Sequence, residues 1–286
     1  MMGARAVPAV LCALLCAVLA VPLAPSHAQE RGFPHDVPFV PTAQLTVDEM
    51  LRLAGVTAKD FVIDLGSGDG RIVITAARKF GARGLGVDLD FNLVIQSEES
   101  ARQAGVADRV QFLQQDLFKT DLSPASVITT YLLPGVMLKL RDRLLALKPG
   151  TRVVSHDFDL GDWKPDQTTS VRKNVYLWIV PAQVAGVWRT SIELPAAARK
   201  LDLEFTQRYQ QVSAHGRLDG APAMVWEARI AGERLSFVMT DADAGEGESA
   251  LYFEGRVSGD VIEGEVTRGV GMQRRVAKWR AVRIKR

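Results

Sequence analysis

Thiols are nearly absent from this sequence. Of its 286 residues only two are cysteine, Cys12 and Cys16, and both lie within the first 28. The histidines are also few, four in the whole chain, and none stands at the spacing of metal ligands. We therefore expect no metal site. The formal net charge of +2 is too small to indicate a nucleic-acid partner.

The first 28 residues have the composition of a secretory signal. They hold one charged residue, Arg5, an apolar stretch over 6–23, and small residues at the two positions of Ser26-His27-Ala28 that a signal peptidase reads. We expect cleavage before Gln29 and an exported protein, periplasmic or secreted. Cleavage would also remove both cysteines, which excludes disulfides and cysteine nucleophiles from the mature chain.

An uncleaved membrane anchor is the alternative interpretation of the same segment. Pro8 and Pro22 interrupt it, and they leave the apolar run shorter than the ~20 residues that a membrane span needs. The sequence favours cleavage, and a cleaved chain would have no stable membrane span.

Residues 61–90 hold most of the functional information. A short apolar run, 61–65, leads into a glycine-rich turn, and a helix-length apolar stretch is followed by a second apolar run over 84–89. The turn reads Gly66-Ser67-Gly68-Asp69-Gly70. Strand, turn, helix and strand in this order predict half of a nucleotide-binding α/β sheet.

The spacing of the glycines indicates which nucleotide binds. A dinucleotide fold needs a third glycine at position 71, where this chain has Arg71. Asp64 stands two residues before the first glycine, and a carboxylate there suits a cationic amino group better than a pyrophosphate. S-adenosylmethionine fits, with its amino group near Asp64, its ribose hydroxyls on Asp88 and its adenine beyond.

Alternation of strands and helices continues to about residue 155. We expect helices over 46–54, 92–105 and 136–147 and strands over 110–113, 125–131 and 151–155. Thr46 is the expected N-cap of the first helix, with Glu49 completing a capping box. The pattern predicts a doubly wound, mainly parallel α/β sheet of the Rossmann-like kind. Ligands in such sheets bind at the carboxyl ends of the strands, which would bring together Asp64, Asp88, Asp116, Tyr131, His156 and Asp157.

The pattern changes near residue 183. Leu201, Leu203 and Phe205 alternate with polar residues, as in a strand with one buried face. Further strands are expected over 224–230, 235–240, 250–257, 261–267 and 276–284, which predicts a small antiparallel all-β barrel or sandwich of about six to eight strands. We place the domains at 38–182 and 183–286. The segment 175–180 suits either sheet, and 241–248 is expected to be an acidic loop.

The basic residues of the C-terminal segment have two interpretations. They are typical of the solvated face of a last strand, or they contact an anionic surface.

The turn with its flanking acids resembles the class I S-adenosylmethionine-dependent methyltransferases over roughly residues 38–180. A closer likeness is to the protein-lysine methyltransferases that act on the c-subunit of mitochondrial ATP synthase, and to their prokaryotic relatives. The matching segments are Phe39-Val40-Pro41, Asp64–Ile74 and Trp163-Lys164-Pro165-Asp166. The turn and this resemblance together give a predicted set of cofactor-binding residues: Phe39, Pro41, Asp64, Gly66, Gly68, Gly70, Asp88 and Asp116.

The chain departs from that family at three points. Phe39 replaces a usual tyrosine, Asp90 replaces a common asparagine, and the C-terminal β-domain has no counterpart in the family's lysine enzymes. The Asn/Asp-Pro-Pro-Tyr signature of enzymes that methylate nucleic-acid bases is also absent, since the corresponding stretch, 130–134, reads Thr-Tyr-Leu-Leu-Pro.

A general base is needed only if the methyl acceptor arrives protonated, as a lysine ammonium does. Asp157 and Asp159 are the candidates for that role, with Tyr131 and His156 as orienting groups. All four also suit structural roles, and Trp163 either walls a substrate channel or packs in the core.

The sequence thus predicts a methyltransferase of the cell envelope that uses S-adenosylmethionine, with a protein lysine as candidate acceptor. The alternative is a non-catalytic envelope protein that binds a nucleoside in its Rossmann-like domain and a second ligand in its β-domain.

Overall fold

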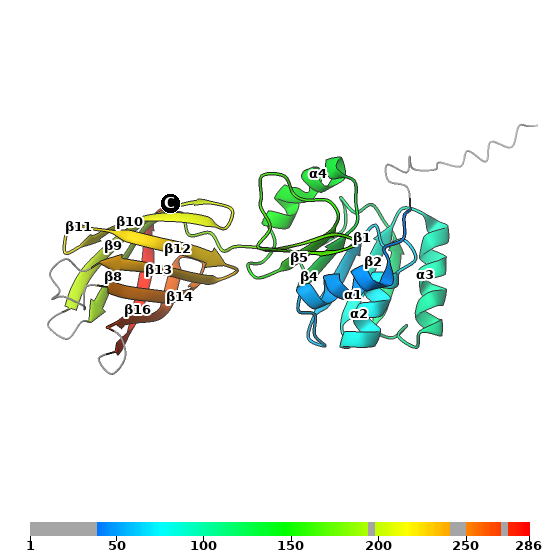
Figure 1. The fold of residues 1–286 in the computed structure, drawn as a ribbon, viewed down its shortest axis with the longest axis horizontal. Helices are drawn as coiled ribbons and strands as arrows, with labels where there is room; N and C mark the ends of the chain where they lie inside the picture. The colour runs from blue at the N-terminus through cyan, green and yellow to red at the C-terminus, as the bar shows by residue number, and fades with distance from the viewer. Residues whose placement is uncertain (1–38, 194–197, 241–249, 270–273) are drawn as a thin grey trace, which may run out of the picture. The chain divides into compact units, whose positions relative to one another are not determined.

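The computed structural model describes residues 39–193, 198–240, 250–269 and 274–286. The predicted signal segment, His35 and the acidic run 241–248 lie outside the described residues. Figure 1 shows helices and strands alternating along the first part of the described chain. These elements are α1 (Gln44–Leu53), β1 (Phe61–Leu65), α2 (Arg71–Phe80), β2 (Arg83–Asp88), α3 (Phe91–Gln103), β3 (Val110–Gln114), β4 (Val127–Thr130), α4 (Pro134–Leu145), β5 (Arg152–His156), β6 (Gln167–Val171) and β7 (Lys173–Ile179).

Strands β1–β7 form one sheet of seven strands in the order β3-β2-β1-β4-β5-β7-β6. The first five in that order run parallel, and β7 pairs antiparallel with β5. This pairing assigns the segment 175–180 to the first sheet. Strand order reverses between β1 and β4, where a doubly wound sheet opens its ligand crevice. The predicted Rossmann-like α/β sheet is confirmed.

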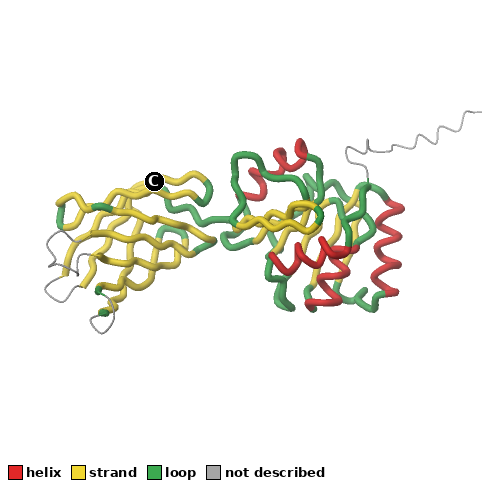
Figure 2. The backbone as a smooth tube through the Cα atoms, viewed as in Figure 1, coloured by secondary structure: helices red, strands yellow, loops and turns green. Residues whose placement is uncertain are grey.

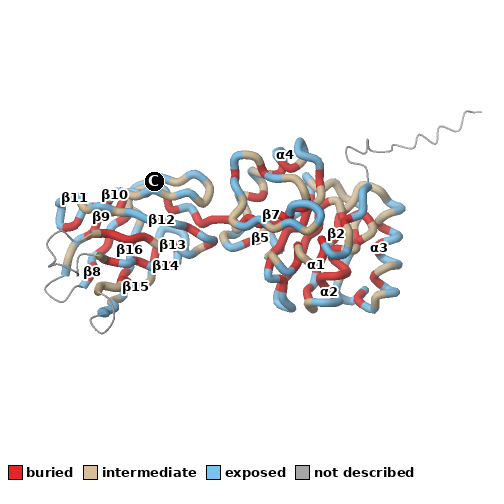
Figure 3. The backbone as a smooth tube through the Cα atoms, in the orientation of Figure 1, coloured by how far each residue is buried: buried red, intermediate tan, exposed pale blue. Residues whose placement is uncertain are grey.

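Alternate residues of β1 supply the cores on the two faces of the sheet. Val62 packs with α1 and α2 through Val47 and Ile72, whereas Ile63 packs on the opposite face with Met137 of α4. All of these side chains are buried. Figure 3 shows buried backbone segments in red in this sheet and in the helices beside it. Because both faces are covered, the sequence of β1 is a continuous apolar run rather than an alternating one.

The predicted start of the first helix was wrong. Helix α1 begins after Ala43, whose methyl side chain cannot accept a capping hydrogen bond. The expected capping box therefore does not form. Thr46 is instead buried in the first turn, where its hydroxyl donates to the carbonyl of Val171 at 3.3 Å. A bond to a hairpin 125 residues away leaves no signal in a local pattern. Among the described residues, no helix is both long and apolar enough to cross a membrane.

The described part of the chain from Gly186 onward consists of β-strands and the turns between them, as Figure 2 shows. They are β8 (Gly186–Glu193), β9 (Ala198–Arg208), β10 (Gln211–Leu218), β11 (Ala221–Ala223), β12 (Val225–Ala231), β13 (Arg234–Thr240), β14 (Ala250–Ser258), β15 (Val261–Arg268) and β16 (Arg275–Lys285). The order is β11-β10-β12-β13-β14-β15-β16-β8-β9, and an additional pairing of β9 with β10 closes the sheet. Apart from the three-residue β11, this is a closed antiparallel barrel of eight strands, so the barrel is observed and not the sandwich.

Side chains fill the inside of the barrel. Phe237 stacks on Phe253 with 4.5 Å between ring centroids, and Trp279 meets both rings edge-on. In β16 the basic residues Lys278 and Arg280 alternate with the buried Trp279 and point away from the core. They therefore form the outer face of the last described strand, as one of the two interpretations expects.

Two inward-facing glycines allow close packing inside the barrel. Gly255 and Gly264 are paired across β14 and β15. A Cβ atom on Gly255 would lie 2.9 Å from Cζ2 of Trp279, and a Cβ atom on Gly264 would lie 2.5 Å from Cα of Gly255 and overlap the carbonyl oxygen of Glu254. Gly264 is therefore required by a backbone that passes too close for any side chain.

Replacement of this glycine tests the barrel packing. We expect Gly264→Ala to lower the free energy of unfolding by about 1–3 kcal/mol, because the clash is with backbone atoms that cannot rotate away. Urea denaturation followed by circular dichroism measures it. Gly135→Ala is the matched control, since nothing lies within 4 Å of the added methyl group in α4. A loss of stability in Gly135→Ala as large as in Gly264→Ala would contradict the argument.

Candidate cofactor and acceptor site

The glycine-rich turn between β1 and α2 is built on left-handed backbone. Gly66, Gly68 and Gly70 have φ of +76°, +54° and +76°, a conformation that other residues seldom adopt. The amides of Gly66 and Ser67 both donate to the carbonyl of Val87 at 2.9 Å. A Cβ atom on Gly68 would overlap the ring of Phe39. The turn requires glycine at this position, because the ring of Phe39 packs directly against it.

Asp88 ends β2 and is joined to the turn. Its Oδ2 accepts the amide of Gly68 at 2.8 Å, and its Oδ1 accepts the amide of Asp90 at 3.0 Å. Asp116 follows β3, is partly exposed, and accepts the amide of Phe118 at 2.8 Å. Asp88 is therefore positioned by backbone donors beside the glycines, while Asp116 shapes its own loop.

Asp64 is the most buried ionisable group of the site. Its side chain is 1% exposed, Oδ1 accepts the hydroxyl of Thr129 at 2.7 Å, and Oδ2 is buried without a partner. Burial raises the pKa of Asp64 to about 7, and the nearby carboxylates of Asp88 and Asp69 also raise it. A buried carboxylate with a free oxygen is suited to receive a cationic group. Thr129 was missed in the sequence, since only the pairing of β1 with β4 brings it beside Asp64.

A short arm, residues 39–42, lies against both the turn and β5. Arg71 donates to the carbonyl of Thr42 at 2.8 Å and pairs with Asp69 at 2.5 Å. The hydroxyl of Thr42 lies 3.1 Å from Nδ1 of His156. Arg71, which takes the place of a dinucleotide-type glycine, thus has a structural use: it fastens the arm. Pro41 is exposed within the arm.

Tyr131 and His156 meet at the carboxyl ends of β4 and β5. Their ring centroids are 4.0 Å apart, and Tyr131 also stacks on Phe158 at 6.1 Å. His156 is 5% exposed, and its Nε2 is buried without a partner. Burial lowers the pKa of His156, and the charge of Lys173 lowers it too, while Asp157 opposes both. The structure therefore holds His156 as a neutral imidazole near pH 7.

Asp157 stands in strained backbone. Its φ is +65°, and the amide of Phe158 donates to the carbonyl of His156 at 2.8 Å, which makes a three-residue turn around Asp157. Its Oδ2 accepts from Nζ of Lys173 at 2.9 Å. Lys173 was missed because the β6–β7 hairpin that carries it was not predicted. Residues held in rare conformations cluster at functional sites, and this one follows directly after His156.

The other residues singled out from the sequence have structural surroundings. Asp159 is exposed and accepts the amide of Gly161 at 2.9 Å, as a loop-capping acid does. Trp163 is fully buried and packs against Trp178 and Tyr209, at 6.2 and 6.1 Å between centroids. Trp163 is therefore core packing and does not line a channel. Within the described ranges, no group of three or more metal-binding side chains comes together.

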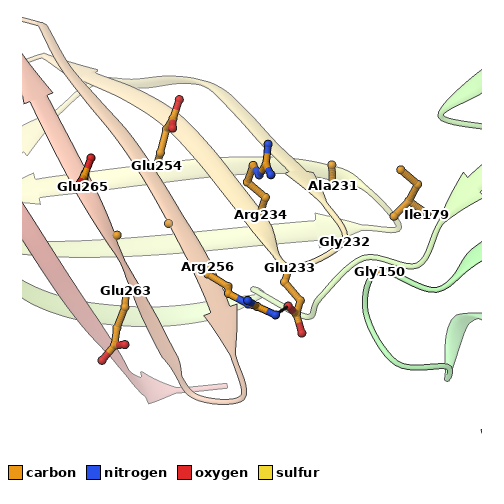
Figure 4. A pocket seen from close by; sticks show the side chains of 12 residues that line it. Gly150, Ile179, Ala231, Gly232, Glu233, Arg234, Glu254, Arg256, Glu263 and Glu265 are labelled. Carbon is orange, nitrogen blue, oxygen red and sulfur yellow. Dashed lines mark ion pairs between the residues drawn. The ribbon is translucent and has the colours of Figure 1, made fainter. Parts of the chain in front are cut away.

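A separate pocket of about 760 Å³ lies along the barrel strands (Figure 4). It is lined mainly by Ala231–Arg234 and by Glu254–Arg256 and Glu263–Glu265, and Glu233 pairs with Arg256. None of the predicted site residues borders it. The crevice around Asp64 remains the candidate site.

The residues of this crevice fit S-adenosylmethionine. The unpaired Oδ2 of Asp64 suits its amino group, and the carboxylate of Asp88, held beside the glycine turn, suits its ribose hydroxyls. A doubly wound sheet with this crevice defines the class of S-adenosylmethionine-dependent methyltransferases.

Comparison with known proteins agrees. The family model described as ANTKMT methyltransferase domain matches residues 64–167. A protein-lysine N-methyltransferase of Saccharolobus islandicus is 39% identical over 154 residues, which is 51% of this chain and 95% of that relative. The ATP synthase c-subunit lysine N-methyltransferase of Mus musculus is 36% identical over 46% of this chain, which spans about half (53%) of the mouse protein.

A solved structure gives the same result. An RNA methyltransferase from Salinibacter ruber, in complex with S-adenosyl-L-homocysteine, is 54% identical with a TM-score of 0.50 and covers 51% of this chain and 96% of its own. The chain belongs to the family of the archaeal lysine N-methyltransferase. It is a methyltransferase, and its cofactor is S-adenosylmethionine.

Ionisation of Asp64 should control cofactor affinity. Since burial raises the pKa of Asp64 to about 7, the carboxylate is mostly protonated at pH 6 and mostly charged at pH 8. We expect the charge on Asp64 to contribute a factor of about ten in S-adenosylmethionine affinity between pH 6 and pH 8, taken as the difference between wild type and Asp64→Asn in titration calorimetry. In Asp64→Asn the only pH dependence of binding that remains should be that of the cofactor's own amino group. An equal pH dependence in both proteins would contradict this assignment.

The unliganded protein provides the control for that experiment. A carboxyl whose pKa is raised on folding stabilises the fold fully below its unfolded value, near 3.8. That contribution is lost as pH rises through about 7. Wild-type protein without cofactor should therefore lose more stability between pH 5 and pH 8 than Asp64→Asn does.

Proposed function

We propose that this protein methylates lysine amines of proteins in the cell envelope. The supporting observation is the carboxylate of Asp157, which lies beside the neutral His156 at the acceptor end of the crevice and already holds an ammonium group at 2.9 Å. The archaeal and mouse relatives are both named as lysine N-methyltransferases. The envelope location rests on the leader of residues 1–28.

At the cofactor end the side chains bind and orient. When bound, the cofactor supplies an activated methyl group on a sulfonium sulfur. Asp64 takes its amino group through the unpaired Oδ2, and Asp88 takes the ribose hydroxyls. Fixing the methyl carbon in line with its acceptor supplies several kcal/mol of the barrier lowering in reactions of this kind.

At the acceptor end the chemistry needs a proton to leave the ammonium. Asp157 holds the charged amine, and His156 receives the proton on Nε2. This requires the tautomer in which Nδ1–H donates to Thr42 Oγ1, at 3.1 Å. Because burial lowers the pKa of His156, the imidazole is neutral and ready to accept at pH 7. With the cofactor bound, the neutral amine would form a bond to the methyl carbon as the bond from that carbon to the sulfonium sulfur breaks, and S-adenosyl-L-homocysteine would leave with that electron pair.

The division of the chain at residues 182 and 183 belongs to the same proposal. The cofactor and acceptor residues named above all precede position 183, and the barrel begins at Gly186. The barrel interior is packed with side chains, which favours the outer surface of the barrel for capture of the protein substrate or placement in the envelope.

A labelling experiment tests the reaction. We expect purified protein to transfer the labelled methyl group of S-adenosylmethionine to envelope extract, and the label to be sensitive to protease and recovered as methyl-lysine. Asp88→Ala is the control, because loss of two charge-assisted hydrogen bonds to ribose should weaken cofactor binding about a hundredfold or more. If ribonuclease removes the label instead, the acceptor is RNA, as the name of the Salinibacter ruber RNA methyltransferase states for that protein. No transfer to any component of the extract would contradict an acceptor in the cell envelope.

Export gives a prediction of its own. In a bacterial host the mature chain should begin at Gln29, because Ser26-His27-Ala28 is the well-placed cleavage site after the apolar stretch. Intact mass of the protein released from the periplasm measures the cleavage. A full-length chain that fractionates with membranes would instead support an uncleaved leader that acts as a membrane anchor.

A further inference from the structure

The β6–β7 hairpin brings a lysine of the chain itself to the acceptor end. Lys173 begins β7, directly after Arg172, whose φ is +66°. Its Nζ lies 2.9 Å from Oδ2 of Asp157, and its side chain is 59% exposed while that of Asp157 is 18% exposed. The carboxylate is thus shielded by the protein, and the lysine approaches it from solvent.

Tyr131 and His156, which belong to the proposed acceptor site, are the titratable groups that interact with this pair. Asp157 raises the pKa of Lys173, and the nearby Tyr131 raises it as well, so that Lys173 stays an ammonium. His156, the residue before Asp157, is affected by both charges. Lys173 therefore shares its surroundings with Tyr131 and His156 and is not an isolated surface pair.

We propose that Lys173 occupies the binding position of the acceptor lysine, so that an incoming amine must displace it from Asp157. This assignment rests on the proposed function, since it requires an acceptor that arrives as an ammonium. It makes Asp157 the specificity-determining residue for a cationic acceptor and Lys173 its internal competitor.

Two properties of the pair make displacement feasible. A largely exposed lysine gains little by holding one geometry, because solvent screens the charges and the long side chain loses conformational freedom. The side chain of Asp157 is 18% exposed, so the carboxylate stays largely within the protein when the lysine leaves. An exposed ion pair of this kind corresponds to a factor of about two to five in an equilibrium constant. Competition of that size lowers the affinity for an acceptor amine but still allows the amine to bind.

The test uses n-butylammonium as a probe with the chemistry of a lysine side chain. Binding to the full mature chain, with S-adenosyl-L-homocysteine present, is followed by NMR at the backbone amides of Asp157, Asn174 and Thr42. We expect Lys173→Met to bind the probe about two to five times more tightly than wild type. Lys173→Arg, which keeps the ion pair, should behave like wild type.

Two further variants complete the design. Lys148→Met removes a lysine from the turn before β5, at the opposite end of that strand, and should leave probe affinity unchanged. Adding Asp157→Asn to Lys173→Met should abolish binding. Equal affinity in wild type and Lys173→Met, or no binding in Lys173→Met, would overturn the inference.

Methyl transfer provides a separate readout. With envelope extract as acceptor, Lys173→Met should lower KM by the same factor of about two to five and leave S-adenosyl-L-homocysteine affinity unchanged. A change in kcat alone would overturn the role of Lys173 as a competitor. If no protein is methylated but the amine still binds as expected, the proposed function fails while the ammonium site stands.

Discussion

One buried carboxyl group, that of Asp64, governs the arrangement of the site. It lies at the carboxyl end of the central strand, where the order of the parallel strands reverses. A charge in that place is unfavourable unless a cation meets it, and Thr129 supplies a hydrogen bond to only one of its oxygens. The fold thus keeps a group that the amino group of S-adenosylmethionine would satisfy. The glycine turn and Asp88 then determine how the rest of that ligand lies.

The cofactor end and the acceptor end are not independent. Arg71 holds the arm at Thr42 on one side, and the hydroxyl of Thr42 orients His156 on the other. Movement of the arm would therefore disturb the glycine turn and the imidazole together. Phe39 lies over Gly68 within the same arm, so the aromatic residue matters for packing even without the tyrosine hydroxyl of its relatives.

The sequence predicts what depends on backbone geometry and periodicity. The glycine turn, Asp64, Asp88, the parallel sheet and the all-β second part all follow from spacing and alternation. Thr129, Thr42 and Lys173 do not, because each reaches the site through a pairing between segments far apart in the chain. The same reason explains the wrong cap at Thr46, whose partner lies in the β6–β7 hairpin.

The match to the family model covers most of the cofactor end of the site and only part of the acceptor end. The match to the family model runs over 64–167 and includes the glycine turn, Asp88, His156 and Asp157. The arm that orients His156 and the lysine that pairs with Asp157 both lie outside it. Cofactor binding depends on a backbone that must be glycine and on one buried acid, which leaves little freedom to change. Within the proposed function, acceptor choice rests on side chains of an arm and a hairpin, which can change without cost to the fold. We therefore expect the acceptor to vary more readily than the cofactor among sequences that share this fold.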